Sequence, residues 1–134
     1  MNEQTLLLRQ VNPNFIQDGE VTSQAFTPFP KDKGNLSVDD GDQTSPEASF
    51  QYFTQTLGFA SAGVWAVNGT EVHGTGLTYR PDPIPNKTDI PGNLAHALID
   101  FGTRSDKECR KLAKILKRHA STRGGLYKGR GALP

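Results

Sequence analysis

Short apolar runs, interrupted by turn-forming residues, recur along the first hundred residues and predict a series of strands. The first run, Thr5 to Val11, is apolar on both faces, so we expect it in the centre of a sheet. Asp18-Gly19 predicts a tight turn into a second strand over residues 20–26. Further strands are expected in three segments: 36–38, 61–67 and 94–101.

Apolar residues at helical spacing predict two helices. The first begins at Ser45-Pro46-Glu47, where a hydroxyl N-cap precedes a proline, and its expected buried stripe is Phe50, Phe53 and Leu57. The second begins at a capping box formed by Ser105 and Glu108 and ends near residue 121. Its expected apolar stripe consists of Cys109, Leu112, Ala113, Leu116 and Ala120.

These elements are interspersed without the spacing of βαβ units, which favours an α+β fold. We expect a mixed or antiparallel sheet of about five strands with two main helices, the last one basic and amphipathic. Residues 1–123 are expected to form a single domain, followed by a basic, Gly-rich, flexible tail over 124–134. The prolines between Pro81 and Pro91 predict a long loop without regular structure, and such loops often carry function.

Charge divides the chain into two unequal parts. Residues 1–103 hold five Lys or Arg against twelve Asp or Glu, and residues 104–134 hold ten against two, so an acidic body ends in a basic helix. The single cysteine forms no internal disulfide, and the longest apolar run, Leu6-Leu7-Leu8, is too short to span a bilayer. Because the first residues also lack a basic signal region, we expect a cytoplasmic protein with no membrane partner.

The basic helix is the first functional candidate. We expect it to bind nucleic acid or an acidic protein partner through five cations: Arg110, Lys111, Lys114, Lys117 and Arg118. No known nucleic-acid motif is present, and Tyr127 is the only aromatic residue interleaved with the basic segment. The alternatives are an ordinary solvated helix face and a helix that docks on the acidic loop Asp39–Asp42 of its own chain.

The second candidate is a small transferase or hydrolase with a catalytic site near Arg9, Ser23 and His96. An arginine on a central strand needs a carboxylate, a phosphate or an anionic ligand, and Ser23 is expected on the neighbouring strand. His96 follows the proline-rich loop and suits acid–base chemistry; the alternative is a half-exposed histidine on the sheet surface. No Gly-rich phosphate loop, HExxH motif or cysteine pair is present, so neither metal nor cofactor is predicted.

An arginine on the first strand, a strand serine and a later acidic residue resemble the ADP-ribosyltransferase superfamily, in which the arginine and serine help to position NAD. Arg9 and Ser23 carry this resemblance, and Glu71 is the only late acidic match outside the last helix. The stretch from residue 8 to residue 38, with 63–67 and 95–97, resembles a family of small bacterial hypothetical proteins, which implies a bacterial origin.

The low apolar fraction allows a third functional class. Only 34% of the residues are hydrophobic, and a thin core is often completed by a partner. An antitoxin-like subunit that depends on a complex is therefore the second alternative to a binding protein that acts through its basic helix.

Overall fold

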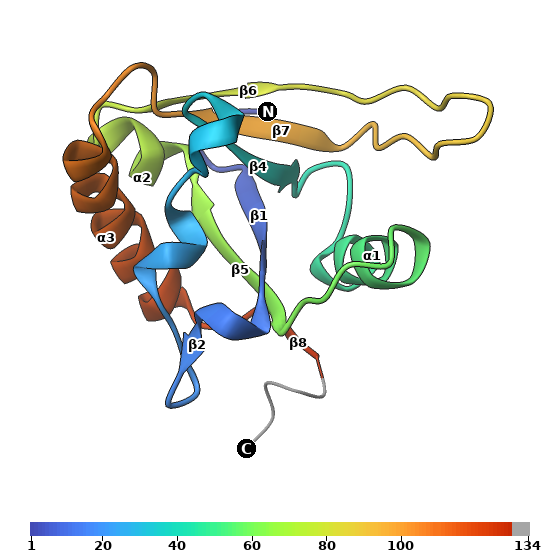
Figure 1. Ribbon diagram of the computed structural model, residues 1–134, viewed down its shortest axis with the longest axis horizontal. Helices are drawn as coiled ribbons and strands as arrows, with labels where there is room; N and C mark the ends of the chain where they lie inside the picture. The colour runs from blue at the N-terminus through green and yellow to red at the C-terminus, as the bar shows by residue number, and fades with distance from the viewer. Residues whose placement is uncertain (130–134) are drawn as a thin grey trace.

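A computed structural model of the chain describes residues 1–129 and shows one six-stranded sheet with helices on both of its faces (Figure 1). Every neighbouring pair of strands is antiparallel. The order across the sheet is β6 (Thr78–Pro81), β7 (His96–Asp100), β4 (Asn35–Asp40), β1 (Leu6–Val11), β5 (Gly63–Asn68) and β8 (Tyr127–Lys128). The predicted α+β class is confirmed, and the first predicted strand does lie in the centre of the sheet, over Leu6–Val11.

The main core lies between the sheet and α3 (Asp106–Arg123). Four residues of α3 are buried there, namely Cys109, Ala113, Leu116 and Ala120. Most of them are small, so the helix approaches the strands closely. The predicted start is confirmed, because the Ser105 hydroxyl accepts a hydrogen bond from the Glu108 N–H at 3.2 Å. The other half of the predicted capping box is not formed; Glu108 contacts the Ser105 hydroxyl instead.

The opposite face of the sheet carries α1 (Pro46–Gln51) and a smaller apolar cluster around Leu8, Val64 and Ala66. Ser45 caps α1 as predicted. The predicted buried stripe is confirmed only at Phe50, which packs against this cluster, because after Gln51 the chain widens into a π-turn over Tyr52–Thr56 and the 3.6-residue period ends. Leu57 is consequently exposed, and Ser49 is the buried residue of α1.

The second predicted strand is also wrong beyond its first residues. Only Glu20–Val21 is extended, as β3, and it pairs with β2 (Ile16–Gln17) in a separate two-stranded ribbon. Ser23–Phe26 forms a 3-10 helix, η2, which places the consecutive residues Ala25 and Phe26 in the core beneath α3. A strand cannot bury two consecutive side chains on one face, so the tertiary contact overrides the local alternation.

Two segments contain more structure than we expected. Gly69–Gly74 forms a short helix, α2, with a complete capping box between Asn68 and Glu71. The proline-rich segment between β6 and β7 forms a long arm, in which Ile84 pairs with Asn93 and Lys87 with Ile90 (Figure 1). We predicted a tail from residue 124, but Tyr127–Lys128 pairs with β5; residues 130–134 lie outside the described part. In that described part no helix is long and apolar enough to cross a membrane.

Glu71 joins α2, the end of β5 and α3. Its carboxylate accepts hydrogen bonds from the Asn68 N–H and from both terminal nitrogens of Arg123, at 2.8 and 3.1 Å. Partial burial raises the pKa of Glu71, but the bonds from Arg123 and Asn68 and the charges of Arg123 and His119 outweigh it. They hold the pKa below its ordinary value of 4.5.

Glu71→Gln is therefore expected to destabilise the protein at neutral pH by about 1 kcal/mol, since it removes the ion pair and keeps the polar side chain. Because the folded pKa is lowered, the stabilisation is present above pH 4.5 and is lost as the pH falls through the folded pKa. Urea unfolding of the unaltered protein and of Glu71→Gln over this pH range measures the difference between their free energies of unfolding. A difference that did not narrow in acid would contradict this assignment.

Candidate functional site

The two central strands β1 and β4 separate along half of their length. They pair at Leu7 with Asp40 and at Leu8 with Asp39, and the Gly41 N–H donates to the Leu6 carbonyl. In an antiparallel ladder the bonded pairs alternate, so Gln10 and Ser37 would form the next one. That pair is not formed. The main-chain N–H of Gln10 therefore faces the opening between the strands.

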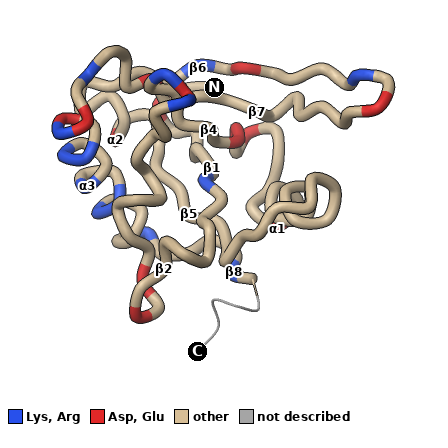
Figure 2. The backbone as a smooth tube through the Cα atoms, viewed as in Figure 1, with Lys and Arg blue, Asp and Glu red and all other residues tan. Residues whose placement is uncertain are grey.

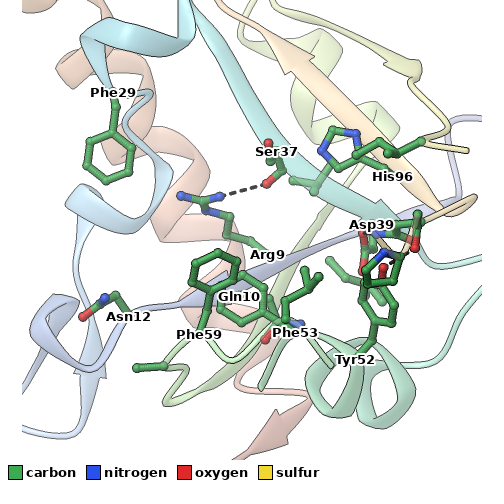
Figure 3. Close-up of a pocket in the computed structure, with 18 of the residues that line it drawn as sticks. Arg9, Gln10, Asn12, Phe29, Ser37, Asp39, Tyr52, Phe53, Phe59 and His96 are labelled. Carbon is green, nitrogen blue, oxygen red and sulfur yellow. Dashed lines mark hydrogen bonds between the residues drawn. The ribbon is translucent and has the colours of Figure 1, made fainter. Parts of the chain in front are cut away.

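Arg9 occupies this opening (Figure 3). Its Nη1 donates to the Ser37 carbonyl at 2.9 Å, which is the acceptor that an unbroken ladder would offer to Gln10. Its Nε donates to the Ala25 carbonyl of η2 at 2.7 Å. The guanidinium thus links β4 to the segment that packs beneath α3, and it takes the place of a backbone hydrogen bond.

The positive charge of Arg9 has no carboxylate partner among the described residues. Both of its hydrogen bonds go to carbonyl groups, and Nη2 bonds to no described residue. Removal of the guanidinium from water lowers the pKa of Arg9 to about 10, and the attraction of Asp32 opposes this shift only in part. Arg9 remains a cation at neutral pH, and its charge is incompletely compensated.

A cavity of about 550 Å³ opens over Arg9, and we call it the Arg9 cavity. Its walls are apolar although they are open to solvent. Of the seven large apolar side chains that are exposed in the described part of the chain, five line this cavity: Phe29, Leu57, Phe59, Ile84 and Ile90. Exposed apolar groups gathered in one concavity indicate a surface that another molecule covers.

A chain of polar side chains supports the cavity floor. The Ser61 hydroxyl donates to Gln10, the Gln10 amide donates to Ser49, and Ser49 donates to Asp39 at 2.6 Å. The other Asp39 oxygen accepts from Asn93 of the arm at 2.8 Å. Both oxygens of Asp39 are therefore occupied, which makes this carboxylate a positioning group that ties β4 to α1 and to the arm.

The arm is held at a second point. The Tyr52 hydroxyl of the π-turn donates to the Gly92 carbonyl, and both residues line the Arg9 cavity. Asn93 and Tyr52 thus fix the arm as one wall, and Ile84 and Ile90 stay directed at the opening.

His96 lies at the β7 side of the same cavity, directly across from Asp39 in the neighbouring strand. Its Nδ1 is 3.0 Å from the Asp82 carbonyl and 3.1 Å from the Asp82 carboxylate. Because both groups accept hydrogen bonds, Nδ1 carries the proton and Nε2 is the basic nitrogen of the neutral ring. In chemical terms, the cavity combines a cation, an acceptor or base, and apolar walls.

Two of the three residues predicted for an enzyme site meet in this cavity and one does not. Arg9 and His96 both line it (Figure 3), whereas Ser23 lies in η2 and lines a different cavity next to α3. The reason is the 3-10 helix, which carries Ser23 away from the sheet. Asp39, Tyr52, Phe59 and Asn93 were not predicted as site residues; the only signal for them was the proline-rich loop that precedes Asn93.

The five predicted binding cations lie on the outer side of α3 (Figure 2). Lys117 is half-buried and the other four, Arg110, Lys111, Lys114 and Arg118, are exposed. We call these five residues the basic face. None of them pairs with a carboxylate of the described chain.

The acidic loop of the same chain does not neutralise the basic face. Asp39 is bonded to Ser49 and Asn93, Asp40 accepts from Gln43 and from the Asp42 N–H, and Asp42 accepts from Thr5. These carboxylates are used locally at the end of β4, so the alternative of a helix docked on its own acidic loop is wrong.

Cys109 and the metal-ligating residue types provide no further candidate site in the described part of the chain. Cys109 packs in the core as predicted, and burial, followed by the charge of Asp106, raises the pKa of its thiol. Within residues 1–129 no group of three or more His, Cys, Asp or Glu side chains is placed to hold a metal ion.

Comparison with known proteins found no match: no family model, no curated protein and no solved structure matches the chain.

Arg9→Lys is expected to destabilise the protein by about 1–2 kcal/mol, because an ammonium group cannot bridge the Ala25 and Ser37 carbonyls as a planar guanidinium does. Urea unfolding measures the change. Arg80→Lys is the matched control, since Arg80 is exposed and forms a surface ion pair with Asp100. Equal stability of the two variants would show that Arg9 does not hold the separated strands.

Proposed function

We propose that this protein binds a small organic anion in the Arg9 cavity, with the anionic group on Arg9 and an apolar body between the aromatic walls. The observation that carries the proposal is the guanidinium held without a carboxylate at the floor of an apolar concavity. A carboxylate, sulfonate or phosphate would accept hydrogen bonds from the Arg9 Nη2 and from the Gln10 N–H, and it would complete the charge balance.

The size and lining of the cavity fit this class of ligand. Its volume of about 550 Å³ is within the range of small-molecule sites. Phe53 and Phe59 lie in contact, with ring centroids 5.2 Å apart, and form an aromatic wall on the side of α1. At the other end, Nε2 of His96 accepts a hydrogen bond from a hydroxyl or amine of the ligand. The transferase or hydrolase alternative would use the same cavity, with Arg9 and His96 but without Ser23.

Anilinonaphthalene sulfonate, an anion on a flat apolar body, is a suitable probe, and its neutral analogue phenylnaphthylamine separates the two contributions. Arg9→Met is expected to weaken binding of the sulfonate at least about tenfold and binding of the neutral probe by a smaller factor, because both probes lose the gap that the guanidinium holds open but only the sulfonate also loses a charge-assisted contact. Fluorescence titration measures both affinities.

Arg80→Met is the matched control for this experiment, since it removes an arginine outside the cavity and is expected to change neither affinity. Phe59→Ala tests the wall independently of Arg9; the side chain is 57% exposed, so the fold tolerates the change, and both probes should bind more weakly. Unchanged sulfonate binding by a folded Arg9→Met variant would refute the proposal.

A second candidate function is binding of nucleic acid or an acidic protein partner by the basic face. The observation in its favour is that the five cations are unpaired within the described chain although twelve acidic residues lie in the first 103 positions. Clustered, unneutralised cations raise the local concentration of polyanions and the rate of association.

Replacing Lys111, Lys114, Lys117 and Arg118 together with Ala is expected to abolish binding of a polyanion such as heparin at about physiological salt, since each lost contact removes one counterion-release contribution. Affinity of the unaltered protein should fall as salt rises. Retention on a heparin column, compared with that of a Lys31→Ala, Lys87→Ala control, measures the effect. Elution of the fourfold variant at the same salt concentration as the unaltered protein would count against polyanion binding by the basic face.

A further inference from the structure

A second cavity, of about 670 Å³, lies between the segment that follows β3 and the first half of α3. We call it the α3 groove. Its lining includes Ser23, the Pro28–Pro30 segment and the first two turns of α3. Phe15 and Phe29 line both this groove and the Arg9 cavity, so this aromatic pair separates the two. Arg110 and Lys114 belong to the groove and to the basic face, which makes the two surfaces continuous.

The groove gathers cations that are distant in the sequence: Lys33, Arg104, Arg110 and Lys114. Asp106 is the only carboxylate among its lining residues. Arg104 is held in place because its guanidinium donates to the carbonyls of Phe101 and Gly76, at 2.9 and 3.3 Å. None of the four forms an ion pair with a described carboxylate, so the groove is strongly electropositive.

The groove also presents an exposed aromatic ring. The side chain of Phe29 is 46% exposed, although burial of so large an apolar ring is favourable. Pro28 and Pro30 flank it and restrict the backbone from which the ring projects. Phe29 is separated from the basic helix by more than seventy residues in the sequence, and only the fold places the ring beside the cations.

We propose that the α3 groove and the basic face together bind single-stranded nucleic acid, with phosphates on Arg110, Lys114 and Lys33 and one base stacked on Phe29. The proposal rests on the second candidate function and assigns its partner. An aromatic face beside a cationic track is the combination that recognises unpaired bases, since every base has a stacking surface. A duplex buries the stacking surfaces of its bases, and the carboxylates of an acidic protein have no stacking surface.

The path is short. Arg110 and Arg118 lie about 12 Å apart along the helix axis, at roughly 1.5 Å per residue. An oligonucleotide of about ten nucleotides covers this track and the groove, which is within the usual site sizes of single-strand binding proteins. A fluorescein-labelled deoxythymidine oligomer of that length is the probe, and a fluorescein-labelled DNA hairpin, whose intramolecular stem stays paired at low salt, is the duplex control.

Fluorescence anisotropy at low and at physiological salt tests the groove. Phe29→Ala is expected to weaken single-strand binding by roughly five- to a hundredfold, the range seen when one stacked base is lost. Lys33→Ala should weaken it by a smaller factor and reduce the salt slope by about one phosphate contact. The matched controls are Leu94→Ala, an exposed apolar side chain that lines neither cavity, and Lys31→Ala, an exposed neighbour of Lys33; neither should change the affinity.

The outcomes of these measurements distinguish the proposal for the α3 groove from the second candidate function, on which the proposal rests. Loss of binding in Lys111→Glu, Arg118→Glu, with wild-type affinity in Phe29→Ala and Lys33→Ala, would keep the second candidate function and overturn the groove. Failure of every nucleic acid to bind at low salt would overturn the groove and the nucleic-acid form of the second candidate function. Duplex binding as tight as that of the single strand, or complete displacement by an equal charge concentration of polyglutamate, would also overturn the assignment.

Discussion

The hydrogen bonds of the Arg9 guanidinium to the Ser37 and Ala25 carbonyls are the interaction on which the site depends. A backbone ladder that continued past Leu8 would close β1 against β4 and leave no cavity. Because a planar guanidinium spans a wider gap than a backbone hydrogen bond, the strands stand apart, and its charge is left facing the opening. The same residue thus stabilises the irregularity of the sheet and supplies its chemistry.

The two faces of the sheet differ in what packs against them. On one face, α3 and η2 bury a continuous apolar core that includes Phe26, Phe101 and Leu116. On the other, α1 is short, its continuation is a wide turn, and Phe53 and Leu57 stand over the cavity instead of entering the core. The polar chain from Ser61 to Asp39 takes the place of apolar packing there and connects β1, α1, β4 and the arm. The main apolar core and the aromatic wall of the Arg9 cavity are therefore located on opposite sides of one sheet.

The two candidate sites meet at Phe29 and Phe15, whose ring centroids lie 6.5 Å apart. One side of this pair faces the Arg9 cavity, whose one cation is half-buried, and the other faces the α3 groove with several exposed cations. A small anion with an apolar body suits the first, and a flexible polyanion suits the second. Both proposals use the same physical principle, which is that a cation without a carboxylate partner is available to an anionic ligand.

Local residue patterns determined which segments are strongly periodic and approximately where they begin: the central strand Leu6–Val11, the N-caps Ser45 and Ser105, and the buried stripe of α3. They also singled out Arg9 and His96 because of the chemistry of these residue types. They could not reveal that Ser23 turns away in η2, that Tyr127 pairs with β5, or that Phe29 lies beside Arg110. Those outcomes depend on contacts between residues far apart in the sequence, and such contacts override short-range propensity wherever they bury more surface. The charge of each side chain could therefore be read from the sequence. Only the tertiary structure decided which charges have partners and which face a cavity.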